Sequence, residues 1–145
     1  NDLSRMQVFL TQNGVDVVIG SRYKTGVNVV NWPIQRVLIS YFASWYARII
    51  TGTPIMDLTS GFVGYKAKVL NEILNNGVKF KGYAFQIEMK FKAYNLKYNL
   101  YEIPIIFTDR VKGSSKLNLS IISEAIFGLI TMKISQIFTK IFRWK

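Results

Sequence analysis

Short β-branched segments alternate with helical segments along this chain, and that alternation restricts its fold more than any other feature. Residues 15–20, VDVVIG, are typical of a short strand that is buried in a sheet. Further strand patterns occupy 61–65 and 100–107, and helical patterns occupy 2–12, 34–50, 67–74, 84–96 and 118–142. Strands that alternate with helices predict an α/β layered fold. We expect residues 1–118 to form the main domain and residues 119–145 to form an amphipathic helix.

Composition narrows the range of functions. Half of the 145 residues are hydrophobic and 14% are aromatic, which is enough for a folded core. The chain has 19 Lys and Arg residues against 8 Asp and Glu residues, for a net charge of +11. This excess predicts an anionic partner: a nucleic acid, a membrane surface or a phosphorylated substrate. The chain contains no Cys and no His, which excludes thiolate nucleophiles, Ser–His triads and ordinary zinc sites.

A basic loop follows the last strand pattern. Residues 109–116, DRVKGSSK, bring together three cationic side chains, two hydroxyls and a glycine. Arg110 can bind two phosphate oxygens at once, while Lys116 acts as a point charge. The loop therefore suits a phosphate or a diphosphate, although a solvated basic turn is the simpler explanation when the loop is taken alone.

Two arginines lie where an α/β fold places ligands. Arg22 directly follows the first strand pattern, and ligands bind beyond the carboxyl ends of such strands. Arg36 and Ser40 share one face near the start of a helical pattern, where the helix dipole favours an anion. Solvated surface positions are the alternative for both arginines.

Acidic residues occur singly. Asp57 opens the segment DLTSGF, which could also form a simple Asx or Ser/Thr turn. Gln86 and Glu88 lie in an apolar helical stretch, where they could position a hydroxyl or a cation, or face solvent. There is no DxD pair, no phosphate-binding P-loop and no GxGxxG fingerprint. This chain therefore does not hold all the parts that nucleotide or metal chemistry needs.

Five segments, in this order and spacing, resemble the polyprenol-phosphate mannosyltransferases (dolichol-phosphate mannose synthase type) of glycosyltransferase family 2. The segments are DVVIGSRY, WPxxRxxxS, DLTSGF, GYAFQIE and EIPIxFxDRxxGxSK. The resemblance implies the acceptor-side half of a Rossmann-like GT-A domain, with the nucleotide-binding half and its DxD motif outside this chain. It implies transfer of mannose from GDP-mannose to a polyprenyl or dolichyl phosphate, with inversion. The full-length enzyme would need Mg²⁺ or Mn²⁺, and this chain alone would hold no metal and be inactive.

The same resemblance implies roles for single residues. Those implied are Arg22, Arg36 and Ser40 for the acceptor phosphate; Arg110, Lys116 and Asp57 for catalysis; and Ser60, Gln86, Glu88 and Ser115 for the donor and its sugar. No catalytic base is needed, because the acceptor is already an anion. The enzyme instead has to bring two anions together and stabilise the departing diphosphate.

The pattern of the C-terminal segment predicts association with a membrane. Apolar residues recur at helical spacing in 119–145, but charges interrupt them too often for a spanning helix. We expect an amphipathic helix in the interface of a membrane, at its cytoplasmic face. A helix packed on the domain, or the start of a further membrane segment, are the alternatives.

The expected partners are a polyprenyl phosphate, a nucleotide sugar and a membrane surface. Two other functions also fit a basic, aromatic-rich chain: a nucleic-acid-binding module, and a membrane-interaction domain without catalysis. A nucleic-acid partner is not expected, because the basic residues gather at strand ends and in loops without a helix-turn-helix or RNP-like signature.

Overall fold

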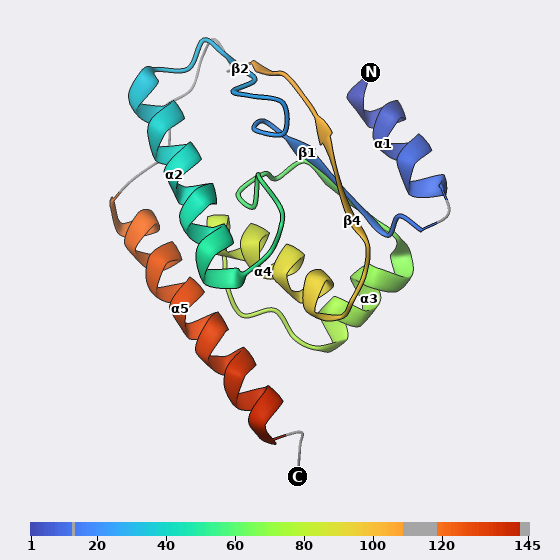
Figure 1. Cartoon of the computed structure of the whole chain (residues 1–145), viewed down its shortest axis with the longest axis vertical. Coiled ribbons are helices and arrows are strands. Elements are labelled where there is room, and N and C mark those ends of the chain that lie inside the picture. Colours follow the sequence, from blue (N-terminus) through green and yellow to red (C-terminus); the bar gives the residue numbers. More distant parts are fainter. Residues whose placement is uncertain (13, 109–118, 143–145) are drawn as a thin grey trace.

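Helices and strands alternate in the computed structural model, which describes residues 1–12, 14–108 and 119–142 (Figure 1). The helices are α1 (Asp2–Thr11), α2 (Ile34–Thr51), α3 (Ala67–Asn75), α4 (Gly82–Asn95) and α5 (Leu119–Phe142). The strands are β1 (Val17–Ser21), β2 (Val29–Val30), β3 (Val63–Tyr65), β4 (Leu100–Pro104) and β5 (Phe107–Thr108). The predicted mixed α/β class is confirmed.

The main sheet has the order β3-β1-β4, with β1 in the centre. β1 runs parallel to β4, where Ser21 lies opposite Pro104, and antiparallel to β3. The single strand predicted at 100–107 is wrong, because the chain leaves β1 after Ile105 and forms β5, which pairs with β2. The change of partner is visible in the backbone: Ile105 N–H donates to Ser21, whereas Phe107 N–H donates to Asn28.

Both faces of β1 are buried, which explains its unbroken apolar sequence. Val17 and Ile19 face a core that includes side chains of α2, α3, α4 and α5. Val18 faces a second core with Met6 of α1 and Ile103 of β4. Figure 1 shows α1 on one side of β1 and β4, and α2 and α5 on the other.

Local signals determine the ends of α2. Pro33 precedes its first residue, and Gly52 ends it in the left-handed conformation, with φ 70° and its N–H donating to Arg48. The helix therefore begins and ends close to the predicted 34–50. This places Arg36 in its first turn.

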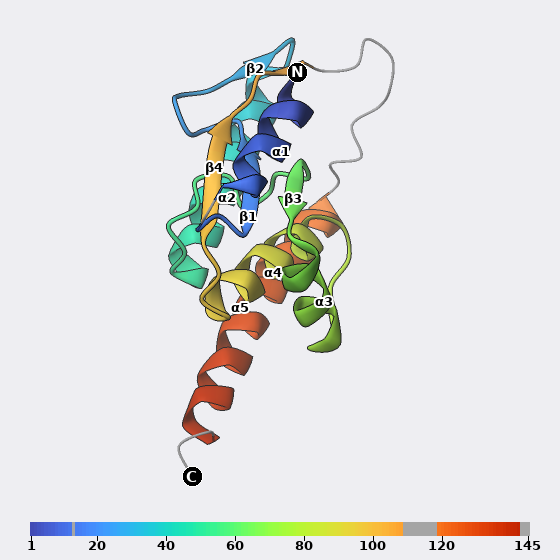
Figure 2. The ribbon, with the colours of Figure 1, turned by 90° about the vertical axis from the view of Figure 1, so that its right-hand side faces the viewer.

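One face of α5 packs on the domain and another is exposed. Leu129 and Met132 are buried in the main core, and Lys133 Nζ donates to the carbonyl of Thr51 at the end of α2, 3.4 Å away. Phe127 and Phe138 are 70% and 57% exposed. The C-terminal part of the helix extends beyond the other elements (Figure 2). Among the described residues, no helix has the length and apolarity that crossing a membrane requires.

Candidate functional site

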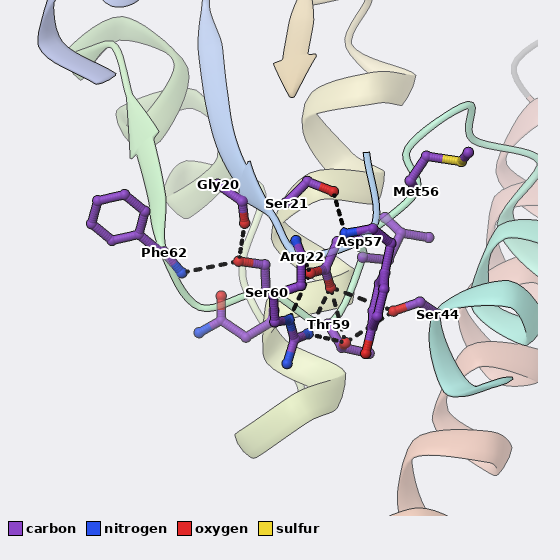
Figure 3. Close-up of polar contacts among 12 residues, drawn as sticks. Gly20, Ser21, Arg22, Ser44, Met56, Asp57, Thr59, Ser60 and Phe62 are labelled. Carbon is purple, nitrogen blue, oxygen red and sulfur yellow. Dashed lines mark hydrogen bonds and ion pairs between the residues drawn. The ribbon is translucent and has the colours of Figure 1, made fainter. Parts of the chain in front are cut away.

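A buried ion pair lies at the carboxyl end of β1. Arg22 directly follows β1, and its Nε and Nη2 donate to the two carboxylate oxygens of Asp57, both at 2.7 Å (Figure 3). The backbone N–H of Arg22 also donates to Asp57. Burial opposes the charge on both groups, but the contacts between them lower the pKa of Asp57 and raise that of Arg22. The Asp57 side chain is fully buried and directed at Arg22, so within this structure it orients the guanidinium.

Hydroxyl groups form further hydrogen bonds to the ion pair and attach the loop that carries Asp57 to the sheet. Thr59 Oγ1 accepts a hydrogen bond from Arg22 Nη2 at 2.9 Å. The Oγ of Ser44 on α2 lies 3.0 Å from the same Thr59 Oγ1. Ser60 Oγ donates to the carbonyl of Gly20 at 2.6 Å and accepts from the N–H of Phe62 (Figure 3). Gly20 has no room for a side chain, since a Cβ there would lie 2.5 Å from the Phe62 ring. The segment DLTSGF is thus a turn anchored on β1.

Trp32 lies between the two arginines that we predicted to bind phosphate. The guanidinium carbon of Arg36 lies 4.0 Å from the centre of the Trp32 ring, and that of Arg22 lies 5.4 Å from it. Ser40 lies near the phenol of Tyr23, which also lies beside Arg22. The structure therefore brings Arg22, Arg36 and Ser40 together around two aromatic side chains.

Gln86 and Glu88, by contrast, face different parts of the molecule. Gln86 lies beside Gly61, next to the loop of Asp57. The Glu88 carboxylate accepts from the backbone N–H groups of Lys79 and Phe80, each at 3.0 Å, and pairs with Lys92. Glu88 thus lines a cavity of about 440 Å³ between α4 and α5 rather than the surroundings of Arg22.

Sequence reasoning missed two buried charged residues under the Asp57 loop. Glu102 of β4 accepts from the backbone N–H groups of Met56 and Asp57, both at 2.9 Å. Lys90 of α4 donates to carbonyls of the same loop. The sequence shows only that Lys90 lies four residues after Gln86 and therefore on the same face of the helix. The pattern gave no hint of its burial.

The remaining predicted residues, Arg110, Ser115 and Lys116, lie outside the described residues. Over the described part of the chain, no group of three or more Asp, Glu, His or Cys side chains is arranged to hold a metal ion. The carboxylates of Asp57, Glu88 and Glu102 all face cationic or N–H donors instead. These residues therefore do not fit a divalent cation.

Two curated relatives resemble the chain closely. A polyprenol monophosphomannose synthase of Mycolicibacterium smegmatis is 43% identical over 114 residues, which are 79% of this chain and 43% of that protein. An undecaprenyl-phosphate mannosyltransferase of Micrococcus luteus is 40% identical over 114 residues, 79% of this chain and 47% of that protein. The chain is homologous to part of these polyprenol-phosphate mannosyltransferases.

The resemblance inferred from the five segments is thereby confirmed. The chain spans less than half the length of either relative. No protein-family model matches it.

Proposed function

We propose that the complete protein is a family 2 glycosyltransferase that moves mannose from GDP-mannose onto a polyprenyl phosphate, with inversion. The observation that carries this proposal is the gathering of Arg22, Arg36 and Ser40 around Trp32 and Tyr23, beyond the carboxyl end of β1. The names of the two homologous proteins support a lipid-phosphate acceptor and a mannosyl group.

Arg22 can bind a second anion through its Nη1 while its other nitrogens remain paired with Asp57. Its Nε and Nη2 are used by Asp57 and Thr59, but its Nη1 has no hydrogen-bond partner among the described residues. The Asp57 carboxylate prevents the guanidinium from rotating, so Nη1 keeps a constant direction. The Trp32 indole N–H is also enclosed and has no partner in the described part of the chain. Both donors suit phosphate oxygens.

The proposed reaction needs positioning more than proton transfer. A phosphate oxygen of the acceptor forms a bond to C1 of mannose, and the bond from C1 to the diphosphate of GDP breaks. The electron pair leaves with the diphosphate, and a single displacement inverts C1. Arg22, Arg36 and Ser40 would hold the attacking phosphate, while Arg110, Ser115 and Lys116 would bind the departing diphosphate.

A divalent cation, Mg²⁺ or Mn²⁺, would neutralise charge on the diphosphate in the complete protein. The described residues offer no ligand set for it. We therefore propose that it is held by residues beyond those described here.

Exposed apolar side chains on α2 and α5 support a peripheral position on a membrane, which we place at its cytoplasmic face. Phe42, Trp45 and Ile49 of α2 are at least half exposed, and they recur at helical spacing. Phe127 and Phe138 lie on α5, which packs beside α2 (Figure 1). A lipid acceptor would reach the site most directly from such a surface.

Kinetics of arginine variants of the complete protein test this function. Arg36→Ala should raise the acceptor KM about ten- to a hundred-fold, since charge-assisted hydrogen bonds contribute about 1.5–3 kcal/mol. Arg36→Lys should restore only part of the loss, because an ammonium cannot form the bidentate contact of a guanidinium. Arg22→Ala should cost at least as much, since Arg22 also carries the buried ion pair.

Arg48→Ala is the matched control. Arg48 lies on the same helix as Arg36, but its Nη1 contacts Met56 instead of the Trp32 cluster. Its replacement should leave the acceptor KM unchanged with a short-chain polyprenyl phosphate. An unchanged KM in both the Arg22 and Arg36 variants would remove these residues from the acceptor site.

A further inference from the structure

Lys90 is a fully buried lysine whose ammonium group is surrounded by backbone carbonyls. Its side chain is 0% exposed on α4. Its Nζ donates to the carbonyls of Ser60, Leu58 and Gln86 at 2.7, 3.0 and 3.1 Å. Three hydrogens meet three acceptors, so an uncharged amine could not satisfy all of them.

Two buried charges of opposite sign hold the Asp57 loop through its backbone. Glu102 accepts from the N–H groups of Met56 and Asp57, while Lys90 donates to the carbonyls of Leu58 and Ser60. These hydrogen bonds thus hold the loop backbone just before Asp57 and on both sides of Thr59. Both of those side chains bind Arg22.

The four charges also balance one another. Asp57 and Glu102 favour the ammonium of Lys90, and Arg22 opposes it. Two buried cations therefore lie near two buried anions: Arg22 directly follows β1, Asp57 is in the loop, Lys90 is on α4 and Glu102 is on β4. Removing one member of such a set leaves an uncompensated charge inside the protein.

We propose that Lys90 is a positioning residue: it holds the carbonyls of Leu58 and Ser60 and thereby sets where Asp57 presents Arg22. It contacts neither of the proposed substrates and acts through the loop. The consequence for acceptor binding rests on the proposed function, whereas the consequence for the loop does not.

Amide hydrogen exchange of the complete protein tests the loop directly. Lys90→Met keeps the length of the side chain and removes all three donors. It should accelerate exchange at Arg22 and at residues 57–62 at least tenfold relative to the amides within β1, because Arg22 N–H donates to Asp57. Lys90→Gln, which keeps two donors without a charge, gives the same comparison if Lys90→Met does not fold.

Ile73→Ala is the matched control. Ile73 is fully buried in α3 and belongs to the main core, and its side chain has no hydrogen-bonding atom. This variant should lower global stability without selective exchange at residues 57–62. Equal exchange of the loop in Lys90→Met and in Ile73→Ala would overturn the proposal.

Acceptor kinetics separate this inference from the proposed function. At a temperature where both variants are folded, Lys90→Met should raise the acceptor KM about tenfold, whereas Ile73→Ala should not change it. If the loop exchanges faster but the wild type transfers no mannose, the proposed function fails and the inference on the loop holds. If the wild type is active and the acceptor KM of Lys90→Met is unchanged, the positioning role is overturned.

A pH profile of acceptor affinity, measured beside one of stability, adds a readout that a purely structural role would not move. Burial lowers the pKa of Lys90 from 10.5 to about 7. Between these values the folded protein is deprotonated and the unfolded chain is protonated at this residue, so unfolding takes up a proton. Stability should therefore rise with pH in this window, by at most about tenfold per pH unit in the unfolding equilibrium.

The affinity for the acceptor should instead fall as the pH rises, because the neutral amine has only two hydrogens for three carbonyls. The wild type should thus gain stability and lose acceptor affinity above pH 7, and Lys90→Met should show neither trend. Parallel profiles for the two proteins would contradict this dependence.

Discussion

Two ion pairs of similar length in this protein should differ greatly in their effect on stability. Arg22 and Asp57 are almost wholly buried, whereas Arg5 and Asp2 of α1 are 48% and 42% exposed in their side chains. Asp57→Asn leaves the guanidinium of Arg22 buried without its counter-ion, and should cost about 3–5 kcal/mol of unfolding free energy. Asp2→Asn should cost less than about 1 kcal/mol. Urea unfolding of the two variants measures the difference, and equal losses would contradict the buried pairing.

The same residue should contribute to acid sensitivity. The pKa of Asp57 is lowered from 3.8 in the folded protein, so its contribution to stability is complete above pH 3.8 and is lost as the pH falls further. Asp57→Asn should therefore unfold with less dependence on pH below pH 4 than the wild type does.

At the scale of an element, the two faces of α5 should respond differently to substitution. Leu129→Ala removes a buried side chain and should cost about 2–5 kcal/mol of stability. Replacing the exposed Phe127, Ile134 and Phe138 together by Ser should leave stability nearly unchanged and weaken binding to anionic liposomes. Flotation measures that binding. It should also fall as salt rises, because the Debye length shrinks from about 10 Å at 0.1 M to about 3 Å at 1 M.

Leu3→Ser with Val8→Ser is the control for this experiment, since both residues are exposed apolar side chains on α1, across the sheet from α5. Flotation that drops equally in this control would mean that the membrane contact is not specific to α5. Unaltered flotation of the α5 variant would assign the contact to another part of the protein.

At the scale of the whole molecule, residues 1–145 alone should bind polyprenyl phosphate without transferring mannose. The proposed acceptor cluster of Arg22, Arg36 and Ser40 lies within the described residues, whereas these residues offer no ligand set for a divalent cation. The chain also spans less than half of either homologous protein. Binding to phosphate-bearing liposomes and transfer from GDP-mannose should be measured side by side. Measurable transfer by these 145 residues would contradict the division of the site between two halves.

The sequence alone determined the order of the five helices and of β1, β3 and β4, and the ends of most of them, but it did not separate the short strands β2 and β5. Helical periodicity, Pro33 before α2 and Gly52 after it are local signals, and the structure follows them. These signals depend on neighbours only a few positions away. The resemblance of the five segments, rather than local position, singled out Arg22, Arg36 and Ser40, because local position left solvated surface positions open for both arginines.

Only the tertiary structure decided which buried groups meet. Asp57 pairs with Arg22 across 35 positions, and Glu102 reaches the Asp57 loop across 45. Lys90 is hidden beneath that loop, although its sequence context gives no sign of a buried cation. Nothing local makes a lysine or a glutamate buried, because the cost of desolvating its charge is offset only by partners that other elements supply. Packing of β1, β4 and α4 supplies those partners, and it thereby forms the site.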